Sequence, residues 1–153
     1  MSLKVDQTAP DFKLHNQNND IIELSKLKKN IILFFYPKDN TPGCTIEAKD
    51  FSSSVTKLNK LGYLVFGISK DSTKKHQNFI ESQKLLIDLL SDEGSNTCED
   101  YGVWKEKNMY GKKYFGIERS TFIIDKKRKI IKIWNKVKVK DHVNEIIAFL
   151  EEN

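Results

Sequence analysis

Short apolar runs along the chain predict the strands of a sheet. Residues 30–37, NIILFFYP, form an almost unbroken apolar run that stops at Pro37. Residues 63–69, YLVFGIS, and residues 85–92, LLIDLLSD, form two more runs of this kind. Such runs are typical of strands buried on both faces, as in a parallel sheet covered by helices. We therefore predict three central strands in these segments.

Apolar residues between these runs recur with helical spacing. They are three or four positions apart over residues 45–61, and Gly62 is well placed to end that helix. Residues 71–83 predict a second helix, with Asp71 or Ser72 as its N-terminal cap. A short helix and a closing amphipathic helix are predicted at 97–102 and 141–153.

Two hairpins complete the prediction. Residues 12–16 and 21–25 flank the turn-like QNND, and residues 121–125 and 129–134 bracket the charged turn KKR. Strands that alternate with helices, followed by a hairpin and a last helix, predict an α/β (α+β sandwich) fold with a central mixed sheet. That order is compatible with a thioredoxin-like fold. No repeat or linker divides the chain, so we expect one domain over residues 1–153.

The net charge of +5 bears on possible partners of the chain. Much of the positive charge lies in residues 126–140, which read KKRKIIKIWNKVKVK. This stretch would suit a nucleic acid or a membrane surface, or it is a solvated hairpin. Lysine dominates arginine, and Trp134 is the one aromatic residue, so no repeated stacking platform is present. We favour the hairpin, and we expect neither a nucleic acid nor a membrane as partner.

Composition also bears on location. Hydrophobic residues make up 39% and charged residues 31% of the 153 residues, which is typical of a globular protein. No apolar run approaches the roughly 20 residues that span a bilayer. The first residues, MSLKVDQTAPDF, lack the apolar region of a signal peptide. We expect a cytoplasmic protein.

Neither a metal nor another cofactor is expected. The three histidines, His15, His76 and His142, are far apart in the sequence and form no ligand-spaced cluster with Cys44 or Cys98. In a reducing compartment the two cysteines are inert, catalytic or redox-sensing rather than a disulfide framework.

The position of Cys44 favours a reactive role. It follows Thr41, Pro42 and Gly43, where the strand over residues 30–37 gives way to a helix. Function gathers beyond the carboxyl ends of strands in open α/β sheets, and the positive end of a helix stabilises a thiolate. An isolated cysteine is more often a small buried hydrophobe. The polar and turn-forming neighbours favour an exposed loop–helix junction over a core position.

Residues 37–45, PKDNTPGCT, resemble the active-site signature of the peroxiredoxins, and the form TPGCT is similar to that of the bacterioferritin comigratory protein subfamily, also called PrxQ. The segments APDF, LLSDEG, YGVW and GIERSTFIID agree in order over nearly the whole chain. The resemblance implies a thioredoxin-like fold with an N-terminal hairpin extension and flanking helices. It also implies an antioxidant peroxidase that reduces hydrogen peroxide and organic hydroperoxides without a metal or haem.

The same resemblance implies roles for individual residues. Cys44 would be the peroxidatic thiolate that becomes a sulfenic acid. Arg119 would hold that thiolate and offer donors to the peroxide. Thr41 would orient the peroxide, and Pro37 would shield the thiolate from water. Ordinary roles stay open: Arg119 as a surface residue, Thr41 as a helix cap, and Pro37 as the end of a strand.

The partner of Cys44 is not determined by the sequence. Many members of the subfamily carry a resolving cysteine five positions after the peroxidatic one, where this chain has Lys49. We favour a one-cysteine mechanism, in which thioredoxin, glutaredoxin or a low-molecular-weight thiol reduces the sulfenic acid. A disulfide between Cys44 and Cys98 is the alternative.

Other classes of function fit less well. A thioredoxin-type oxidoreductase needs a C-x-x-C pair, and residues 44–47 read CTIE. A redox-regulated chaperone remains an alternative that no feature of the sequence favours. The sequence leaves both a monomer and a weak homodimer open.

Overall fold

The computed structural model describes residues 3–152, so residues 1, 2 and 153, the last of which ends the predicted C-terminal helix, lie outside the described residues. The elements in chain order are β1 (Lys13–His15), β2 (Ile21–Glu23), α1 (Leu24–Leu27), β3 (Asn30–Phe35), α2 (Pro42–Lys60), β4 (Tyr63–Ser69), α3 (Thr73–Gln83), β5 (Asp88–Ser91), α4 (Thr97–Asp100), β6 (Trp104–Met109), β7 (Lys112–Ile117), β8 (Ser120–Ile124), β9 (Ile130–Trp134) and α5 (His142–Glu152).

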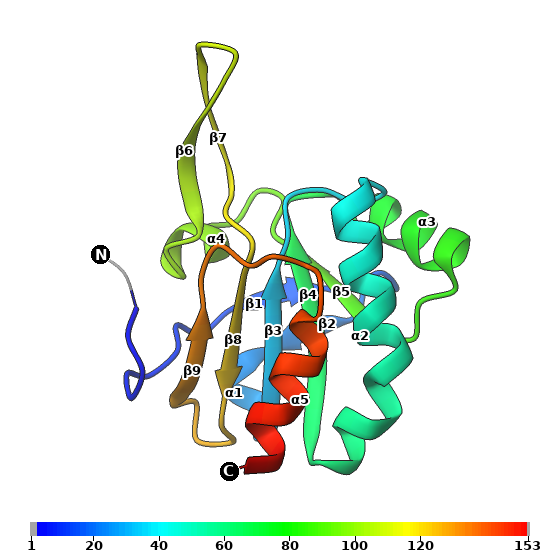
Figure 1. Cartoon of the computed structure of the whole chain (residues 1–153), viewed down its shortest axis with the longest axis vertical. Helices are drawn as coiled ribbons and strands as arrows, with labels where there is room; N and C mark the ends of the chain where they lie inside the picture. The colour runs from blue at the N-terminus through cyan, green and yellow to red at the C-terminus, as the bar shows by residue number, and fades with distance from the viewer. Residues whose placement is uncertain (1–2, 153) are drawn as a thin grey trace.

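Seven strands form one mixed sheet in the order β2-β1-β5-β4-β3-β8-β9. The three apolar runs become its centre, where β3 pairs with β4 and β4 pairs with β5 in parallel. Both predicted hairpins form and extend the sheet at its two sides, because β1 pairs antiparallel with β5 and β8 pairs antiparallel with β3. The predicted central mixed sheet and N-terminal hairpin are confirmed (Figure 1).

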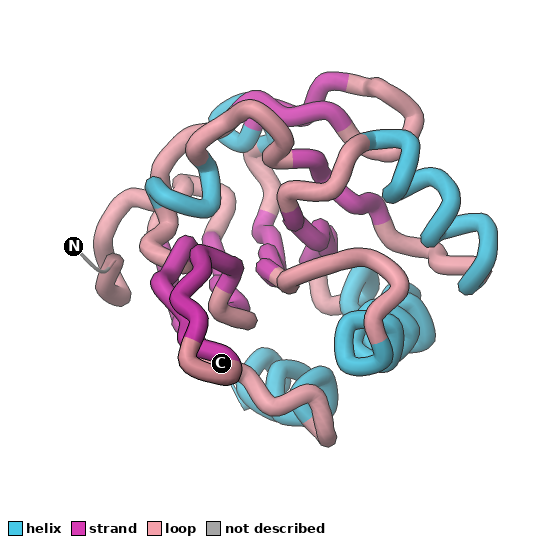
Figure 2. The backbone as a smooth tube through the Cα atoms, turned by 90° about the horizontal axis from the view of Figure 1, so that it is seen from above, coloured by secondary structure: helices cyan, strands magenta, loops and turns pink. Residues whose placement is uncertain are grey.

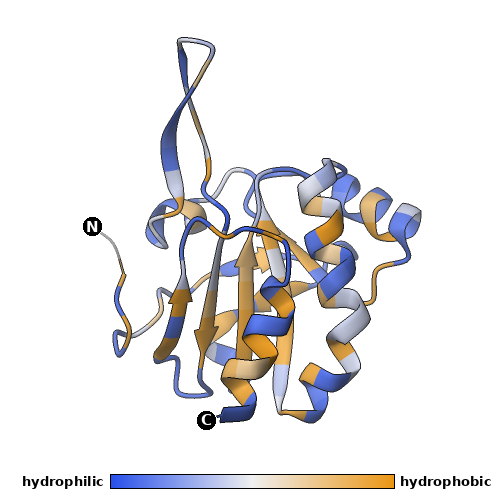
Figure 3. Cartoon of the chain, viewed as in Figure 1, coloured by the Kyte–Doolittle hydropathy of each residue, from blue (hydrophilic) through white to orange (hydrophobic). Residues whose placement is uncertain are grey.

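The sheet separates two apolar cores. Successive side chains of a strand point to opposite faces, so Ile32 and Phe34 of β3 pack with α2, α3 and α5, whereas Leu33 and Phe35 pack with α1, α4 and the N-terminal segment. Figures 1 and 2 show α2 and α5 on one face of the sheet, where they contact each other. The central strands are the most hydrophobic part of the chain in Figure 3.

The predicted helix ends agree closely with the structure. The helix predicted over residues 45–61 is α2, and it ends at Lys60, two residues before the predicted stop at Gly62. Ser72 caps α3, because its hydroxyl oxygen accepts a hydrogen bond of 3.2 Å from the backbone N–H of Lys75. The alternative cap, Asp71, serves elsewhere: its carboxylate accepts from the backbone N–H of Asp39.

Three segments depart from the predictions. Residues 24 and 25 were predicted to end the strand over residues 21–25, but β2 stops at Glu23 and they begin the helix α1. The predicted strand over residues 85–92 is shorter, since β5 spans only Asp88–Ser91 and the preceding Leu86 is 72% exposed. No element was expected between Gly102 and the strand at residue 121, yet β6 and β7 form an antiparallel hairpin there. Its turn is Tyr110–Gly111, both with positive φ, as a two-residue hairpin turn of type I′ requires.

The β6–β7 hairpin protrudes from the end of the molecule at which β3 ends and α2 begins (Figure 1). Its strands are mostly exposed and largely hydrophilic (Figure 3). Only its base, where Trp104 pairs with Ile117, packs on a core, so the rest of the hairpin shows no hydrophobic periodicity from which strands could be predicted. The chain leaves β7 at Ile117 and reaches Arg119 two residues later.

A buried polar network fixes the loop that leads from β3 to α2. The hydroxyl of Tyr36 donates to Asp39 Oδ1 at 2.6 Å, and His76 Nδ1 lies 2.7 Å from Asp39 Oδ2. The other ring nitrogen of His76, Nε2, lies 2.9 Å from the carbonyl oxygen of Leu90. His76 is fully buried and Asp39 nearly so. This network ties the loop before Cys44 to α3 and β5.

We predict that His76→Ala destabilises the fold, because it leaves the buried Asp39 carboxylate without its ring partner. Breaking a buried pair from one side costs about 3 kcal/mol. Urea unfolding measures this cost. His15→Ala is the matched control, since His15 is exposed on β1 and should change the free energy of unfolding by less than about 0.5 kcal/mol. Equal effects of the two substitutions would contradict a role for the network.

Candidate active site

Cys44 is the third residue of α2 and lies in its first turn, as predicted. The loop from the carboxyl end of β3 leads directly to it, so it lies at the edge of the sheet where α/β proteins place their sites. The expectation of an exposed junction is wrong for the side chain, since Cys44 is only 1% exposed. The thiol is covered by its neighbours, because Cys44 belongs to the apolar core on the face of the sheet that carries α2.

Arg119 approaches the thiol from the other end of the chain. Its Nη2 lies 3.4 Å from Cys44 Sγ, and its Nη1 donates to Glu47 Oε1 at 2.7 Å. The side chain is 17% exposed, so the contact is largely shielded from water. Its guanidinium remains charged, and a thiolate beside it gains both a cation and a hydrogen-bond donor. The structure thus brings two of the predicted site residues together.

Glu47 is a site residue that the sequence did not reveal. It lies three positions after Cys44, on the same face of α2, and is 1% exposed. One carboxyl oxygen accepts from Arg119, while Oε2 is buried with no hydrogen-bond partner among the described residues. Burial raises the pKa of Glu47 to about 7, although Arg119 opposes this shift. Its spacing of three positions from Cys44 could have indicated that it lies on the same face of the helix. Glutamate is rarely buried, however, so the sequence provided no reason to place it in the site.

Thr41 and Pro37 lie on the loop between β3 and α2. Thr41 is the N-cap residue by position, but its side chain makes no capping hydrogen bond. The hydroxyl donates instead to the carbonyl oxygen of Lys38 at 2.8 Å, which leaves the oxygen lone pairs free to accept. Pro37 is exposed and follows the buried Tyr36. Their roles toward a peroxide stay predictions.

Cys98 belongs to a different environment. It is the second residue of α4 and is fully buried in the core on the α4 face of the sheet, whereas Cys44 lies in the core on the α2 face. Its backbone N–H donates to Asp92 Oδ2 at 2.8 Å. Burial and the Asp92 carboxylate raise the pKa of the Cys98 thiol well above its usual value. The central sheet stands between the two cysteines.

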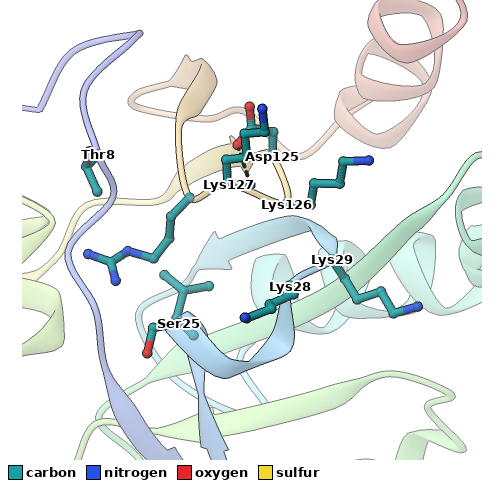
Figure 4. Close-up of a pocket in the computed structure, with 9 residues that line it drawn as sticks. Thr8, Ser25, Lys28, Lys29, Asp125, Lys126 and Lys127 are labelled. Atoms are coloured by element: carbon teal, nitrogen blue, oxygen red, sulfur yellow. Dashed lines mark hydrogen bonds between the residues drawn. The ribbon is translucent and has the colours of Figure 1, made fainter.

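A basic pocket of about 500 Å³ lies away from Cys44, between α1 and the β8–β9 turn. Its cations do not converge: Figure 4 shows the amino groups of Lys28 and Lys29 extending in different directions. The Nε of Arg128 donates to the carbonyl oxygen of Ala9. Among residues 3–152, no three His, Cys, Asp or Glu side chains are placed to hold a metal ion. No helix in that range has the length and apolarity to cross a membrane.

A mixed sheet that presents a cysteine at a helix N-terminus beside an arginine is typical of enzymes with a reactive thiol. Comparison with known proteins narrows this class. The AhpC/TSA family matches residues 5–133. Peroxiredoxin Bcp of Bacillus subtilis is 46% identical over 153 residues, which cover 99% of this chain and 98% of that protein.

Solved structures agree. A PrxQ mutant of Xylella fastidiosa superposes with a TM-score of 0.93 at 32% identity, over 99% of this chain and 98% of that chain. The bacterioferritin comigratory protein of Xanthomonas campestris superposes with a TM-score of 0.87 at 37% identity, over 92% of this chain and 90% of that chain. The chain therefore belongs to the AhpC/TSA family of peroxiredoxins, which are thiol-dependent peroxidases, and its fold is thioredoxin-like.

Gly43→Ala tests the contact between Arg119 and Cys44. A Cβ atom on residue 43 would lie 3.3 Å from Arg119 Nη2, so the guanidinium must shift by a few tenths of an ångström. We expect the rate of peroxide reduction to fall about tenfold, because small displacements of a catalytic group are costly. Stopped-flow kinetics in a single turnover measures this rate.

The same substitution should not harm the fold. Alanine is a better helix former than glycine by up to about 1 kcal/mol, so the free energy of unfolding should hold or rise. Gly116→Ala in β7 is the control, since its Cβ atom would meet only ordinary contacts at 3.4 Å. A Gly43→Ala protein with an unchanged rate would show that the position of Arg119 is not limiting.

Glu47 predicts a pH dependence of stability. Its pKa is about 7 in the folded protein against a usual 4.5, so the folded state holds the proton more tightly than the unfolded state. The stabilisation from this proton is complete below pH 4.5 and is lost as the pH rises through 7. We expect the stability of the wild type, relative to Glu47→Gln, to fall by about 2 kcal/mol between about pH 5 and about pH 8.

Urea unfolding of both proteins across this pH range measures the difference. Glu81→Gln provides the matched control, because Glu81 is exposed on α3 and should track the wild type at every pH. A constant difference between wild type and Glu47→Gln would mean that the Glu47 carboxyl titrates as it does in the unfolded chain.

Proposed function

We propose that this protein reduces hydroperoxides through a sulfenic acid on Cys44, and that an external thiol restores the cysteine. The observation that carries the proposal is the 3.4 Å contact between Arg119 Nη2 and Cys44 Sγ in the first turn of α2. An arginine and a helix N-terminus both favour the thiolate, which is the nucleophilic form. The thiolate attacks one peroxide oxygen, and the O–O bond breaks.

Hydrogen peroxide and organic hydroperoxides are the proposed substrates. The bacterioferritin comigratory protein of Xanthomonas campestris, which shares this fold, has alkyl peroxide reduction activity. An N–H of Arg119 Nη2, beside the thiol, is suited to donate to a peroxide oxygen, and Thr41 Oγ1 is suited to accept from the peroxide O–H. In this arrangement Pro37 limits the access of water from the loop side.

The one-cysteine mechanism draws its support from the placement of Cys98. The thiol of Cys98 is buried in the other core, and its pKa is raised, so it is a poor attacking nucleophile. Position 49, where many members carry the resolving cysteine, is an exposed lysine. A thioredoxin, a glutaredoxin or a low-molecular-weight thiol then supplies the electrons. The alternative is a two-cysteine enzyme in which Cys98 moves to reach Cys44.

The intact mass of the reduced protein after one equivalent of hydrogen peroxide tests the chemistry. We expect a sulfenic-acid trap to form an adduct on Cys44 while Cys98 stays a free thiol. Loss of two hydrogens without an adduct would identify Cys98 as the resolving cysteine. Cys44→Ser should consume no peroxide, and an unchanged wild-type mass would refute the peroxidase.

Cys98→Ser distinguishes the two mechanisms in turnover. We expect this variant to keep the wild-type rate with a thiol reductant to within about threefold, because its thiol takes no part in the one-cysteine cycle. Peroxide consumption coupled to each class of reductant measures the rate. A variant that consumes only one equivalent of peroxide and then stops would establish the two-cysteine mechanism.

A further inference from the structure

One cation in the active site serves two acidic groups. Arg119 contacts Cys44 Sγ with Nη2 and Glu47 Oε1 with Nη1, and all three groups are largely or wholly buried. A thiolate and a carboxylate together would leave this buried cluster with a net negative charge. Two anions that share one buried site do not both ionise readily, so one proton tends to remain between them.

The uncovered oxygen of Glu47 indicates where that proton resides. Oε1 accepts from Arg119, but Oε2 is buried with no hydrogen-bond partner in the described part of the chain. A charged carboxylate oxygen without water or a donor is costly, whereas a neutral carboxyl is much less so. While Cys44 is a thiolate and already balances Arg119, the carboxyl is therefore better neutral.

The remaining titratable groups around the cluster do not supply a second cation. Asp50 on α2 adds negative charge and disfavours ionisation of Glu47. The pKa of Asp50 is itself raised by burial and by Asp141. His142, at the start of α5, has a pKa lowered by burial and by the Arg119 charge, while Glu145 opposes that shift. The charge balance of the site thus rests on Arg119, Cys44 and Glu47.

We propose that Glu47 stores a proton during peroxide reduction: it is protonated while Cys44 is a thiolate and releases its proton when Cys44 becomes a sulfenic acid. This inference rests on the proposed function and concerns the proton count of that same site. Oxidation converts the thiolate into a neutral group, and Glu47 then becomes the counterion of Arg119. Glu47 acts through Arg119 and is a positioning residue rather than a catalytic one.

The step balances in atoms and electrons. The Cys44 sulfur lone pair forms an S–O bond with the OH oxygen of the hydroperoxide, the O–O bond breaks, and the other oxygen leaves with the electron pair. Sulfur is oxidised by two electrons and the peroxide is reduced by two. The leaving alkoxide or hydroxide takes one proton, and the Glu47 carboxyl gives up one. The solvent therefore supplies no net proton, and the total charge of the cluster is unchanged.

The titration of Glu47 is in the range that this role needs. Its pKa of about 7 means that the carboxyl of the reduced enzyme is largely protonated at about pH 6 and largely ionised above about pH 8. The stored proton should therefore be present at the lower pH and absent at the higher one. The number of protons that the reaction takes up from the solvent should therefore change between about pH 6 and about pH 8.

Proton uptake in a single turnover tests the proposal. Reduced protein in weak buffer with a pH indicator dye is mixed with one equivalent of hydrogen peroxide in a stopped-flow instrument. The ultraviolet absorbance of the thiolate, recorded before mixing, gives the amount of Cys44 thiolate at each pH. Proton uptake is then expressed per thiolate oxidised, so a change in thiolate content does not imitate a change in stored protons.

We expect Glu47→Gln to take up about one proton more per thiolate than the wild type at about pH 6, and we expect this difference to close above about pH 8. Glutamine keeps an acceptor for Arg119 Nη1 and the same volume, but it holds no ionisable proton. Glu81→Gln, with its exposed side chain on α3, should match the wild type throughout. Equal uptake by wild type and Glu47→Gln at about pH 6 would overturn the proposal.

The wild type alone provides a second test if Glu47→Gln fails to fold, which circular dichroism would show. Its uptake per thiolate should rise by up to one proton between about pH 6 and about pH 8, and uptake that is independent of pH would refute the storage of a proton. Trapping of the sulfenic acid in the same samples distinguishes a failure of the Glu47 role from a failure of the peroxidase activity. A trapped Cys44 with full uptake at low pH contradicts only the role of Glu47, whereas no trapped Cys44 contradicts the peroxidase itself.

Discussion

The contact between Arg119 and Cys44 is the interaction on which the proposed active site depends. It joins the start of α2 to the segment between β7 and β8, although Cys44 and Arg119 lie 75 positions apart in the sequence. Because the arginine also holds Glu47, one guanidinium determines the position of the thiol, the carboxyl and the first turn of the helix. Geometry and charge are therefore not separable here: a displacement of Arg119 alters both the orientation of the thiolate and the counterion of the cluster.

The rest of the fold brings these groups to one place. The parallel β3 and β4 require a helix between them, and that helix starts at the edge of the sheet where β8 begins antiparallel to β3. The network of Tyr36, Asp39 and His76 then fixes the loop that leads into the helix. Apolar burial holds the layers together, while a few buried polar contacts specify the path of the catalytic loop.

Much of this arrangement could be predicted from the sequence. The apolar run at residues 30–37 predicted β3 because it is buried on both faces, and the turn before Cys44 predicted the start of α2. The β6–β7 hairpin could not be predicted, because only its base, at Trp104 and Ile117, packs on a core and the rest carries no hydrophobic period. Glu47 was hidden for another reason: its burial depends on a partner 72 positions away. The face on which Cys98 lies is likewise a property of tertiary packing.

In the proposed cycle, the burial of Cys44 affects its two reaction partners differently, because they differ in size. A peroxide is a molecule of a few atoms, but the cysteine of a reducing protein is attached to a whole domain, and Cys44 is only 1% exposed. For such a reductant to form a mixed disulfide, the first turn of α2 has to unwind and carry the sulfur outward. The local stability of that single turn then determines the lifetime of the oxidised sulfur before it is reduced. A longer lifetime gives further peroxide more opportunity to over-oxidise the sulfur irreversibly.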